Sequence, residues 1–234
     1  RRAASACRGG NQLMLDIGAN VGTYGIISAA LGCRVIAFEP QSNCRARMNV
    51  ALERNGFLHR VRIVPQPVGR NVGATLWTPA RGCHSAAPSL SSAHVSVDRL
   101  TAVETTSVQN ELQDDETSAR IVMVKIDTEG AEGAVLASLM KYMGRIDNLV
   151  VETTPWRWPL VSNMTRTTVA DIYAALLRPG GFALAYVHSP IARAEWISDP
   201  KEMWVYVGTR MPLHFWGMVD IWFGRDAGLM HLSL

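Results

Sequence analysis

The sequence predicts an α/β fold with a mainly parallel sheet, and three observations support this. Short apolar runs alternate with longer stretches of helical periodicity. Glycine or proline follows the end of most of these segments, and the sequence has no internal repeat or low-complexity segment. Strands that alternate with helices in this way form β-α-β units, with helices on both faces of the sheet. Ligands of such sheets bind at the carboxyl ends of the strands, so residues at those positions are the candidates for function.

The first two strands are each followed by a helix with a recognisable boundary. Residues 13–17 are an apolar run that passes directly into glycine, the pattern of a buried strand before a tight turn. Gly32 stops the helix predicted over 21–31. After the strand over 34–39, Ser42 can cap a second helix, which we expect to run to about residue 54.

The remaining elements show weaker boundaries. Residues 131–143 place several apolar side chains on one helical face. Thr168, with Asp171 three residues later, resembles the start of a capping box for a helix to about residue 178. The polar segment 101–119 predicts a surface excursion. The other strands are expected over 61–68, 95–100, 121–126, 149–151, 182–187 and 203–207, with a small hairpin over 71–79.

Composition limits the possible functions. The chain has 234 residues, 48% of them apolar and 18% charged, which is typical of a globular protein. Its formal charge of +3 comes without a dense run of Lys or Arg, so binding to nucleic acid by phosphate neutralisation alone is not expected. No apolar run reaches the ~18 residues of a membrane span. The compartment and the oligomeric state have no sequence signal, and the cytoplasm is the default.

The loop after the first strand, from Asp16 to Gly22, carries the clearest chemical signal. Gly18 allows a sharp turn out of the strand, and Gly22 allows close approach of the backbone. A nicotinamide-binding loop aims a helix N-terminus at a pyrophosphate, which an acidic residue before the first glycine would repel. Asp16 instead suits a ligand that bears an amino group and a sulfonium, which is S-adenosylmethionine. The alternative is a purely structural turn in which Asp16 caps the helix.

A second acidic residue supports the same cofactor. Glu39 ends the second strand, where its carboxylate can accept hydrogen bonds from both hydroxyls of a ribose. Nicotinamide enzymes share this feature, so Glu39 alone does not discriminate. Gln66 is placed by position near an adenine. The predicted cofactor-binding residues are Asp16, Gly18, Ala19, Asn20, Gly22, Glu39 and Gln66.

Three motifs together resemble the FkbM family of methyltransferases over roughly residues 13–208. They are the loop just described, the sequence Phe38-Glu39-Pro40 and the stretch Lys125-Ile126-Asp127-Thr128-Glu129-Gly130-Ala131-Glu132. The resemblance implies a Rossmann-like class I methyltransferase fold with a seven-stranded sheet whose last strand is antiparallel. It also implies O-methylation of a hydroxyl on a small molecule, sugar or glycan. We therefore expect a truncated N-terminal segment over 1–12, a methyltransferase domain over 13–210 and a C-terminal extension over 211–234.

Methyl transfer to a hydroxyl also requires removal of a proton, so a base near the acceptor is expected. Asp127 ends the fourth main strand and is the first candidate, followed by Glu129 and by His188 at the end of the sixth. For Glu132 we favour a structural role at a helix N-terminus, and Glu152 is open between substrate contact and burial. His84 and His94 are weaker candidates. We assign no metal, because no histidine accompanies the carboxylates.

Other features leave alternatives open. The four cysteines lack metal-ligand spacing and are expected to be free thiols. Asn163-Met164-Thr165 fits a glycosylation sequon, a triplet that is common by chance. The rival functions are an inactive methyltransferase-fold scaffold, a nucleic-acid methyltransferase and, more weakly, a nicotinamide-dependent dehydrogenase. Against the second rival, the sequence has no NPPY-like or DPPY-like tetrapeptide.

Overall fold

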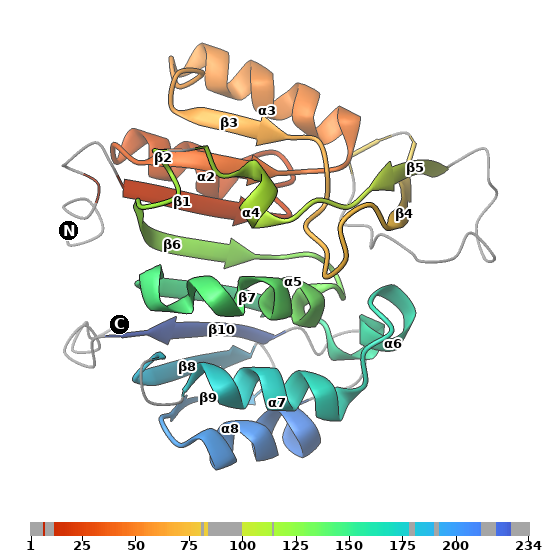
Figure 1. The fold of residues 1–234 in the computed structure, drawn as a ribbon, viewed down its shortest axis with the longest axis vertical. Helices are drawn as coiled ribbons and strands as arrows, with labels where there is room; N and C mark the ends of the chain where they lie inside the picture. The colour runs from red at the N-terminus through yellow and green to blue at the C-terminus, as the bar shows by residue number, and fades with distance from the viewer. Residues whose placement is uncertain are drawn as a thin grey trace.

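The central feature of the computed structural model is an eight-stranded sheet in the order β3-β2-β1-β6-β7-β10-β8-β9 (Figure 1). The structure describes residues 7, 12–80, 82–83, 100–113, 115–177, 181–189, 192–211 and 219–225. The strands of this sheet are β1 (Gln12–Ile17), β2 (Arg34–Phe38), β3 (Val61–Val64), β6 (Arg120–Ile126), β7 (Asn148–Thr153), β8 (Leu184–Ser189), β9 (Ala192–Ile197) and β10 (Val219–Gly224). The predicted α/β class is confirmed.

The sheet has a parallel part and an antiparallel part. All neighbouring pairs among β3, β2, β1, β6 and β7 are parallel, whereas β10 runs antiparallel to both β7 and β8, and β9 runs antiparallel to β8. The expected count of seven strands was wrong, because β9 adds an edge strand. Residues 219–224 were expected in a C-terminal extension, but they form the strand between β7 and β8.

Two groups of helices cover the faces of the sheet. On one face, α2 (Thr23–Ala30) and α3 (Ser42–Arg54) pack through residues such as Met48 onto Met14 of β1. On the other face, α4 (Val108–Glu111), α5 (Glu132–Leu139) and α7 (Arg166–Leu176) cover Leu13 and Leu15 together with the apolar residues of β6, β7 and β10. The alternation along β1 follows from the two-residue period of a strand.

Short helices complete the second half of the chain. They are the 3-10 helices Met140–Arg145 and Pro155–Arg157, α6 (Trp158–Val161), α8 (Pro200–Val205) and the π-helix Tyr206–Arg210. The expected strand over 203–207 was therefore wrong. A local signal for the start of a helix was present but was not used. The Asp199 side chain accepts from the amides of Lys201 and Glu202, and Pro200 occupies the first helical position. Similarly, α7 is capped by Thr165, which accepts from the amide of Thr168, so Thr168 is not the cap.

The segment between β3 and β6 also differs from expectation. β4 (Thr75–Pro79) pairs antiparallel with β5 (Leu100–Glu104), so 71–79 does not form a hairpin by itself. The strand expected over 95–100 falls mostly outside the described residues. Glu116, expected on a surface excursion, is buried between Arg34 and Arg62, whose guanidinium groups lie 2.9 and 2.8 Å from its carboxylate oxygens. Two positive charges explain the burial of this carboxylate.

The prediction of free thiols was wrong. Cys7 pairs with Cys33 and Cys44 pairs with Cys83, each with a Cα–Cα distance of 4.9 Å, within the range for a disulfide. Sequence spacing failed here because the partners are 26 and 39 residues apart and meet only in the folded chain.

No helix among the described residues is long and apolar enough to cross a membrane.

Candidate active site

The site is built on a strand-to-helix turn that only glycine can make. Gly18 has φ +80°, and a Cβ there would overlap the carbonyl oxygen of Asp127 at the end of β6. Gly22 has φ +84°, and a Cβ there would meet the side chain of Met48 on α3. The left-handed conformation and the absence of space both require glycine. The loop is thereby held against β6 and α3.

Asp16 lies beneath this loop and is fully buried. Its Oδ2 accepts from the amide of Gly25 at 2.9 Å, in the first turn of α2, so the side chain caps that helix. Oδ1 has no hydrogen-bond partner among the described residues. Burial raises the pKa of Asp16 to about 6, although the Lys125 ammonium acts in the opposite direction. One oxygen of this buried carboxylate therefore has unused acceptor capacity.

Glu39 follows β2 directly and is 3% exposed. Its Oε2 accepts from the amide of Asn20 at 2.8 Å, and its Oε1 accepts from the amide of Gln41 at 2.7 Å. Burial raises the pKa of this carboxyl group, while the two amides lower it. Each carboxylate oxygen can accept more than one hydrogen bond, so Glu39 retains acceptor capacity toward the space beside it.

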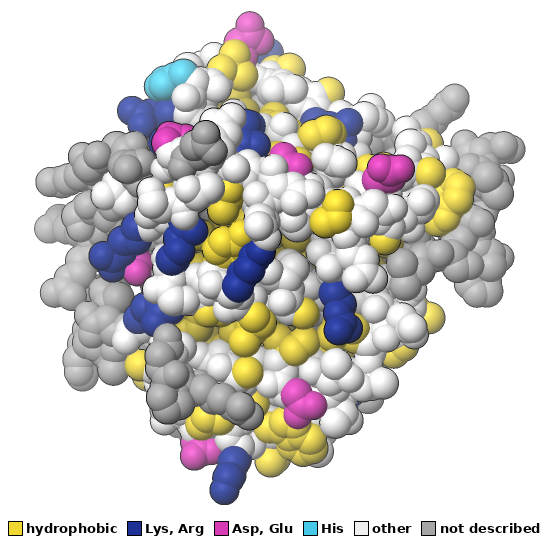
Figure 2. Space-filling view, in the orientation of Figure 1, with side chains coloured by type: hydrophobic (Ala, Val, Ile, Leu, Met, Phe, Trp, Pro, Cys, Tyr) yellow, Lys and Arg dark blue, Asp and Glu magenta, His cyan; other side chains and the backbone are white. Residues whose placement is uncertain are grey.

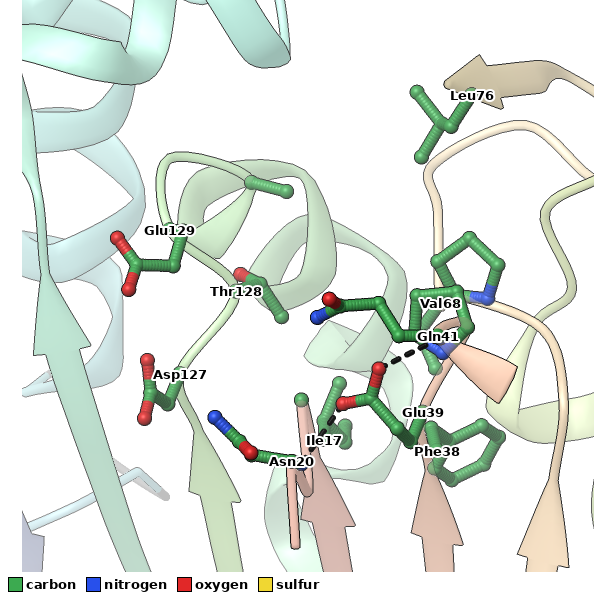
Figure 3. A pocket seen from close by; sticks show the side chains of 14 residues that line it. Ile17, Asn20, Phe38, Glu39, Gln41, Val68, Leu76, Asp127, Thr128 and Glu129 are labelled. Atoms are coloured by element: carbon green, nitrogen blue, oxygen red, sulfur yellow. Dashed lines mark hydrogen bonds between the residues drawn. The ribbon is translucent and has the colours of Figure 1, made fainter. Parts of the chain in front are cut away.

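That space is a pocket of about 630 Å³, including its open mouth. Figure 3 shows Asp127 and Glu129 on one side, Glu39 on the other, and the Gln41 side chain extending inward toward Thr128. The lining residues are Ile17, Gly18, Asn20, Phe38, Glu39, Pro40, Gln41, Pro67, Val68, Leu76, Asp127, Thr128, Glu129 and Ala131. Apolar side chains together with a few convergent polar groups are typical of small-molecule sites.

The pocket brings together some of the predicted residues and not others. Gly18, Asn20, Glu39, Asp127 and Glu129 line it, whereas Asp16, Ala19, Gly22 and Gln66 do not. His84 and His94 lie outside the described residues. Gln41, Thr128 and Leu76 also line the pocket but were not predicted. Thr128 directly follows Asp127 and Gln41 lies two residues after Glu39, so both were detectable from their positions, whereas Leu76 belongs to β4 and reaches the pocket only through tertiary structure.

A row of ionisable residues extends from the pocket along the sheet edge. Ile126 pairs with Val151, so Asp127 and Glu152 are neighbours one position further along β6 and β7. Asp220 pairs with Glu152 on one side and with His188 on the other. Residues opposite each other in a sheet place their side chains on the same face. His188 is thus separated from Asp127 by two strands.

Cationic side chains balance part of this negative charge. Lys125 Nζ lies 2.6 Å from Asp127 Oδ2, and Arg157 Nη1 lies 2.8 Å from Glu129 Oε2. Burial, followed by the charges of Asp127 and Asp220, raises the pKa of Glu152 to about 8. The raised pKa favours the protonated form of Glu152 near neutral pH.

Among the described residues, three carboxylates of this cluster lie close enough together to hold a cation. Asp127, Glu129 and Glu152 each offer an oxygen, and these oxygens lie within 4.8 Å of one another. Oxygen ligands suit Mg²⁺ or Ca²⁺. Because Asp127 and Glu129 already pair with an ammonium and a guanidinium, we assign them no metal.

Glu132 has a structural role, as favoured from the sequence. It is fully buried and accepts from the Gly130 amide at 2.6 Å, from Trp158 Nε1 at 2.9 Å and from Thr154 Oγ1 at 3.2 Å. Burial raises the pKa of its carboxyl group, and these donors lower it. The interactions fix the loop that carries Glu129.

Comparison with known protein families gives an independent assignment. A profile of the Methyltransferase FkbM domain matches residues 16–176, which is most of the chain. The chain belongs to the FkbM methyltransferase family. The FkbM match begins at Asp16 and ends with α7, so β8, β9 and β10 lie beyond it. Methyltransferases of this family and fold generally use S-adenosylmethionine. A comparison with curated protein sequences found no match.

Several solved structures are similar to this chain at low sequence identity. An FkbM methyltransferase from Methylobacillus flagellatus KT is 19% identical, with a TM-score of 0.42, over 61% of this chain and 33% of that one. This chain therefore spans about a third of that protein. A putative rRNA methylase from Clostridium thermocellum is 11% identical, with a TM-score of 0.49, over 93% and 88% of the two chains. A putative caffeoyl-CoA O-methyltransferase from Staphylococcus aureus is 12% identical, with a TM-score of 0.46, over 94% and 80%.

The turn of the FkbM domain yields a stability prediction with a matched control. Gly56 also has a left-handed φ, +71°, but nothing lies within 4 Å of its Cβ position. Gly56→Ala should cost about 1–2 kcal/mol of unfolding free energy, the penalty of the left-handed conformation alone. Gly18→Ala should cost about 1–3 kcal/mol more, because the Asp127 backbone must move. Urea denaturation of both variants measures the difference, and equal costs would contradict the close approach at Gly18.

Proposed function

We propose that this chain binds S-adenosylmethionine in the pocket and transfers its methyl group to a hydroxyl of a small molecule or glycan. The observation that carries the proposal is the continuity of the pocket from Glu39, after β2, to Asp127 and Glu129, after β6. One end offers a ribose-binding carboxylate, and the other offers a base. Both lie at the carboxyl ends of parallel strands, where this class of sheet binds its ligands.

The residues fit the cofactor in charge and in shape. Glu39 has acceptor capacity for ribose hydroxyls, and the walls formed by Phe38, Val68 and Leu76 suit a purine ring. Asp16 lies beneath the loop and not in the pocket wall, and one of its buried oxygens has no partner among the described residues, so its negative charge favours a cationic ligand above the loop. When bound, S-adenosylmethionine supplies a methyl group on a positively charged sulfur that a nucleophile can displace.

The chemistry of the chain itself centres on Asp127. The Lys125 ammonium holds its carboxylate in place at 2.6 Å, and the neutral carboxyl group of Glu152 neighbours it. Asp127 accepts the proton of the acceptor hydroxyl, while Glu129, anchored by Arg157, orients that hydroxyl. His188 stands two strands away at an exposed position and belongs to the outer end of the row. It does not share the pocket with the predicted base.

The nucleic-acid alternative lacks a specific observation in its favour. On the face shown in Figure 2, Lys and Arg side chains lie as separate spots among apolar and acidic ones. A protein that grips a phosphate backbone usually presents a continuous basic surface. Retention on heparin at moderate salt, if observed, would revive this alternative.

Cofactor binding is the first test. Titration calorimetry should show binding of S-adenosylhomocysteine and none of NAD. Glu39→Ala should weaken the affinity by about 1–3 kcal/mol, the range for a hydrogen bond to a charged group. Glu53→Ala, at an exposed glutamate of α3, is the matched control and should bind like the unaltered protein. Binding of NAD, or equal affinity of the two variants, would overturn the assignment of the pocket.

Substitution of Asp16 should change both the stability of the fold and the affinity for the cofactor. Its folded pKa of about 6 exceeds the usual 3.8, so the ligand-free protein loses stability as pH rises through this interval. Asp16→Asn removes the ionisation and should be more stable than the unaltered protein above pH 6, by up to about 3 kcal/mol. It should also bind the cationic cofactor more weakly. Urea denaturation at pH 5 and 7.5 measures the first effect, and a pH-independent difference between the proteins would contradict the buried ionisation.

The two members of the carboxyl pair should respond differently to amide substitution. Asp127→Asn should lower kcat by about 100- to 10,000-fold, the usual contribution of a base, with little change in cofactor affinity. Glu152→Gln replaces a group that is already neutral at pH 7, so kcat at that pH should fall by less than about tenfold. Turnover assays with an accepted hydroxyl substrate measure both. Loss of activity only in Glu152→Gln would reverse the roles of the pair.

A further inference from the structure

The cysteines point to a compartment. The sequence has four cysteines, and all four are joined as Cys7–Cys33 and Cys44–Cys83. The second pair links α3, beside the cofactor loop, to a residue beyond β4. Reducing compartments keep thiols unpaired, so a chain with every cysteine paired is typical of an oxidising compartment. Each pairing releases two protons and transfers two electrons to a protein disulfide oxidant of that compartment.

The sequon has an exposed position in the fold. Asn163-Met164-Thr165 is the only Asn-X-Ser/Thr triplet of the sequence, and its middle residue is not proline. Asn163 and Thr165 are exposed in the short connection between α6 and α7, whereas Met164 is 5% exposed and belongs to the main core. A buried anchor between two exposed residues holds the asparagine at the surface.

The contacts around Asn163 leave its side chain available. The Met164 amide donates to the Trp158 carbonyl oxygen at 3.2 Å, and the Thr165 hydroxyl caps α7. Ser162 Oγ donates to the Gly130 carbonyl oxygen at 3.1 Å. No recorded hydrogen bond within the described residues uses the Asn163 amide. Modification of Asn163 therefore disrupts none of these contacts.

From these two independent observations we propose that Asn163 carries an N-linked glycan, added in the oxidising lumen where the two disulfides form. In this step the Asn163 Nδ2 bonds to the anomeric carbon of a lipid-linked oligosaccharide. The bond from that carbon to the pyrophosphate breaks, the lipid pyrophosphate leaves, and the amide loses one proton. The inference does not depend on methyl transfer.

The test directs the chain into the secretory pathway of a eukaryotic cell behind a cleavable signal. Whole-cell lysate and medium are treated with peptide-N-glycosidase, so that retention of the protein does not hide the modification. The unaltered chain and Thr165→Ser, which keeps both the sequon and the cap hydroxyl, should each lose one discrete increment of mass. Asn163→Gln should show none. Asn55→Gln, at an exposed asparagine outside any sequon, should behave like the unaltered chain.

Peptide mapping without reductant tests the pairing of the four cysteines. Linked peptides should contain Cys7 with Cys33 and Cys44 with Cys83, with no alkylated thiol. If the folded chain shows no change of mass in lysate or medium, the assignment of a glycan to Asn163 is wrong. If all four cysteines of the lumenal protein are alkylated, the assignment of an oxidising compartment is wrong.

Discussion

The turn at Gly18 is the constraint on which the site depends. The amides of Gly18 and Ala19 both donate to the Phe38 carbonyl oxygen, at 2.9 and 3.0 Å, so the loop is fixed to the end of β2. The Asp127 amide donates to the Ile17 carbonyl oxygen at 2.9 Å, which aligns the end of β6 with the same turn. Because both strands end at this point, Glu39 and Asp127 reach one pocket. The geometry of the site is therefore a consequence of backbone packing.

The same packing concentrates negative charge at the sheet edge. Asp16 is buried with one oxygen lacking a partner among the described residues, and the Lys125 ammonium only partly offsets the cost of its desolvation. Burial of a charge without full compensation destabilises a fold. Such a group persists when a ligand supplies the missing charge, and proteins often trade stability for function in this way. The sulfonium and ammonium of the proposed cofactor are groups of that kind.

Local signals were predictable from the sequence, and long-range ones were not. The glycine turn and the carboxylate Glu39 depend on neighbours in the chain, and the structure places both at the pocket. Gln66 was placed by analogy of position, and Pro67 and Val68 line the pocket instead. The disulfides and the insertion of β10 between β7 and β8 depend on contacts between distant segments, which no local pattern records. The helix α8 (Pro200–Val205) is different, because its cap at Asp199 was visible in the sequence and was overlooked.

The residues of the pocket and those that surround Glu152 come from different parts of the chain. Gly18, Glu39 and Asp127 all lie within residues 16–176, the part that matches the FkbM family. Asp220, which neighbours Glu152 and raises its pKa, arrives on β10 from beyond that match. The electrostatics around the predicted base therefore depend partly on a strand outside the family-wide domain. Substitutions on β10 can alter the electrostatics around Glu152 and Asp127 while the backbone contacts that hold Gly18 and Glu39 remain unchanged.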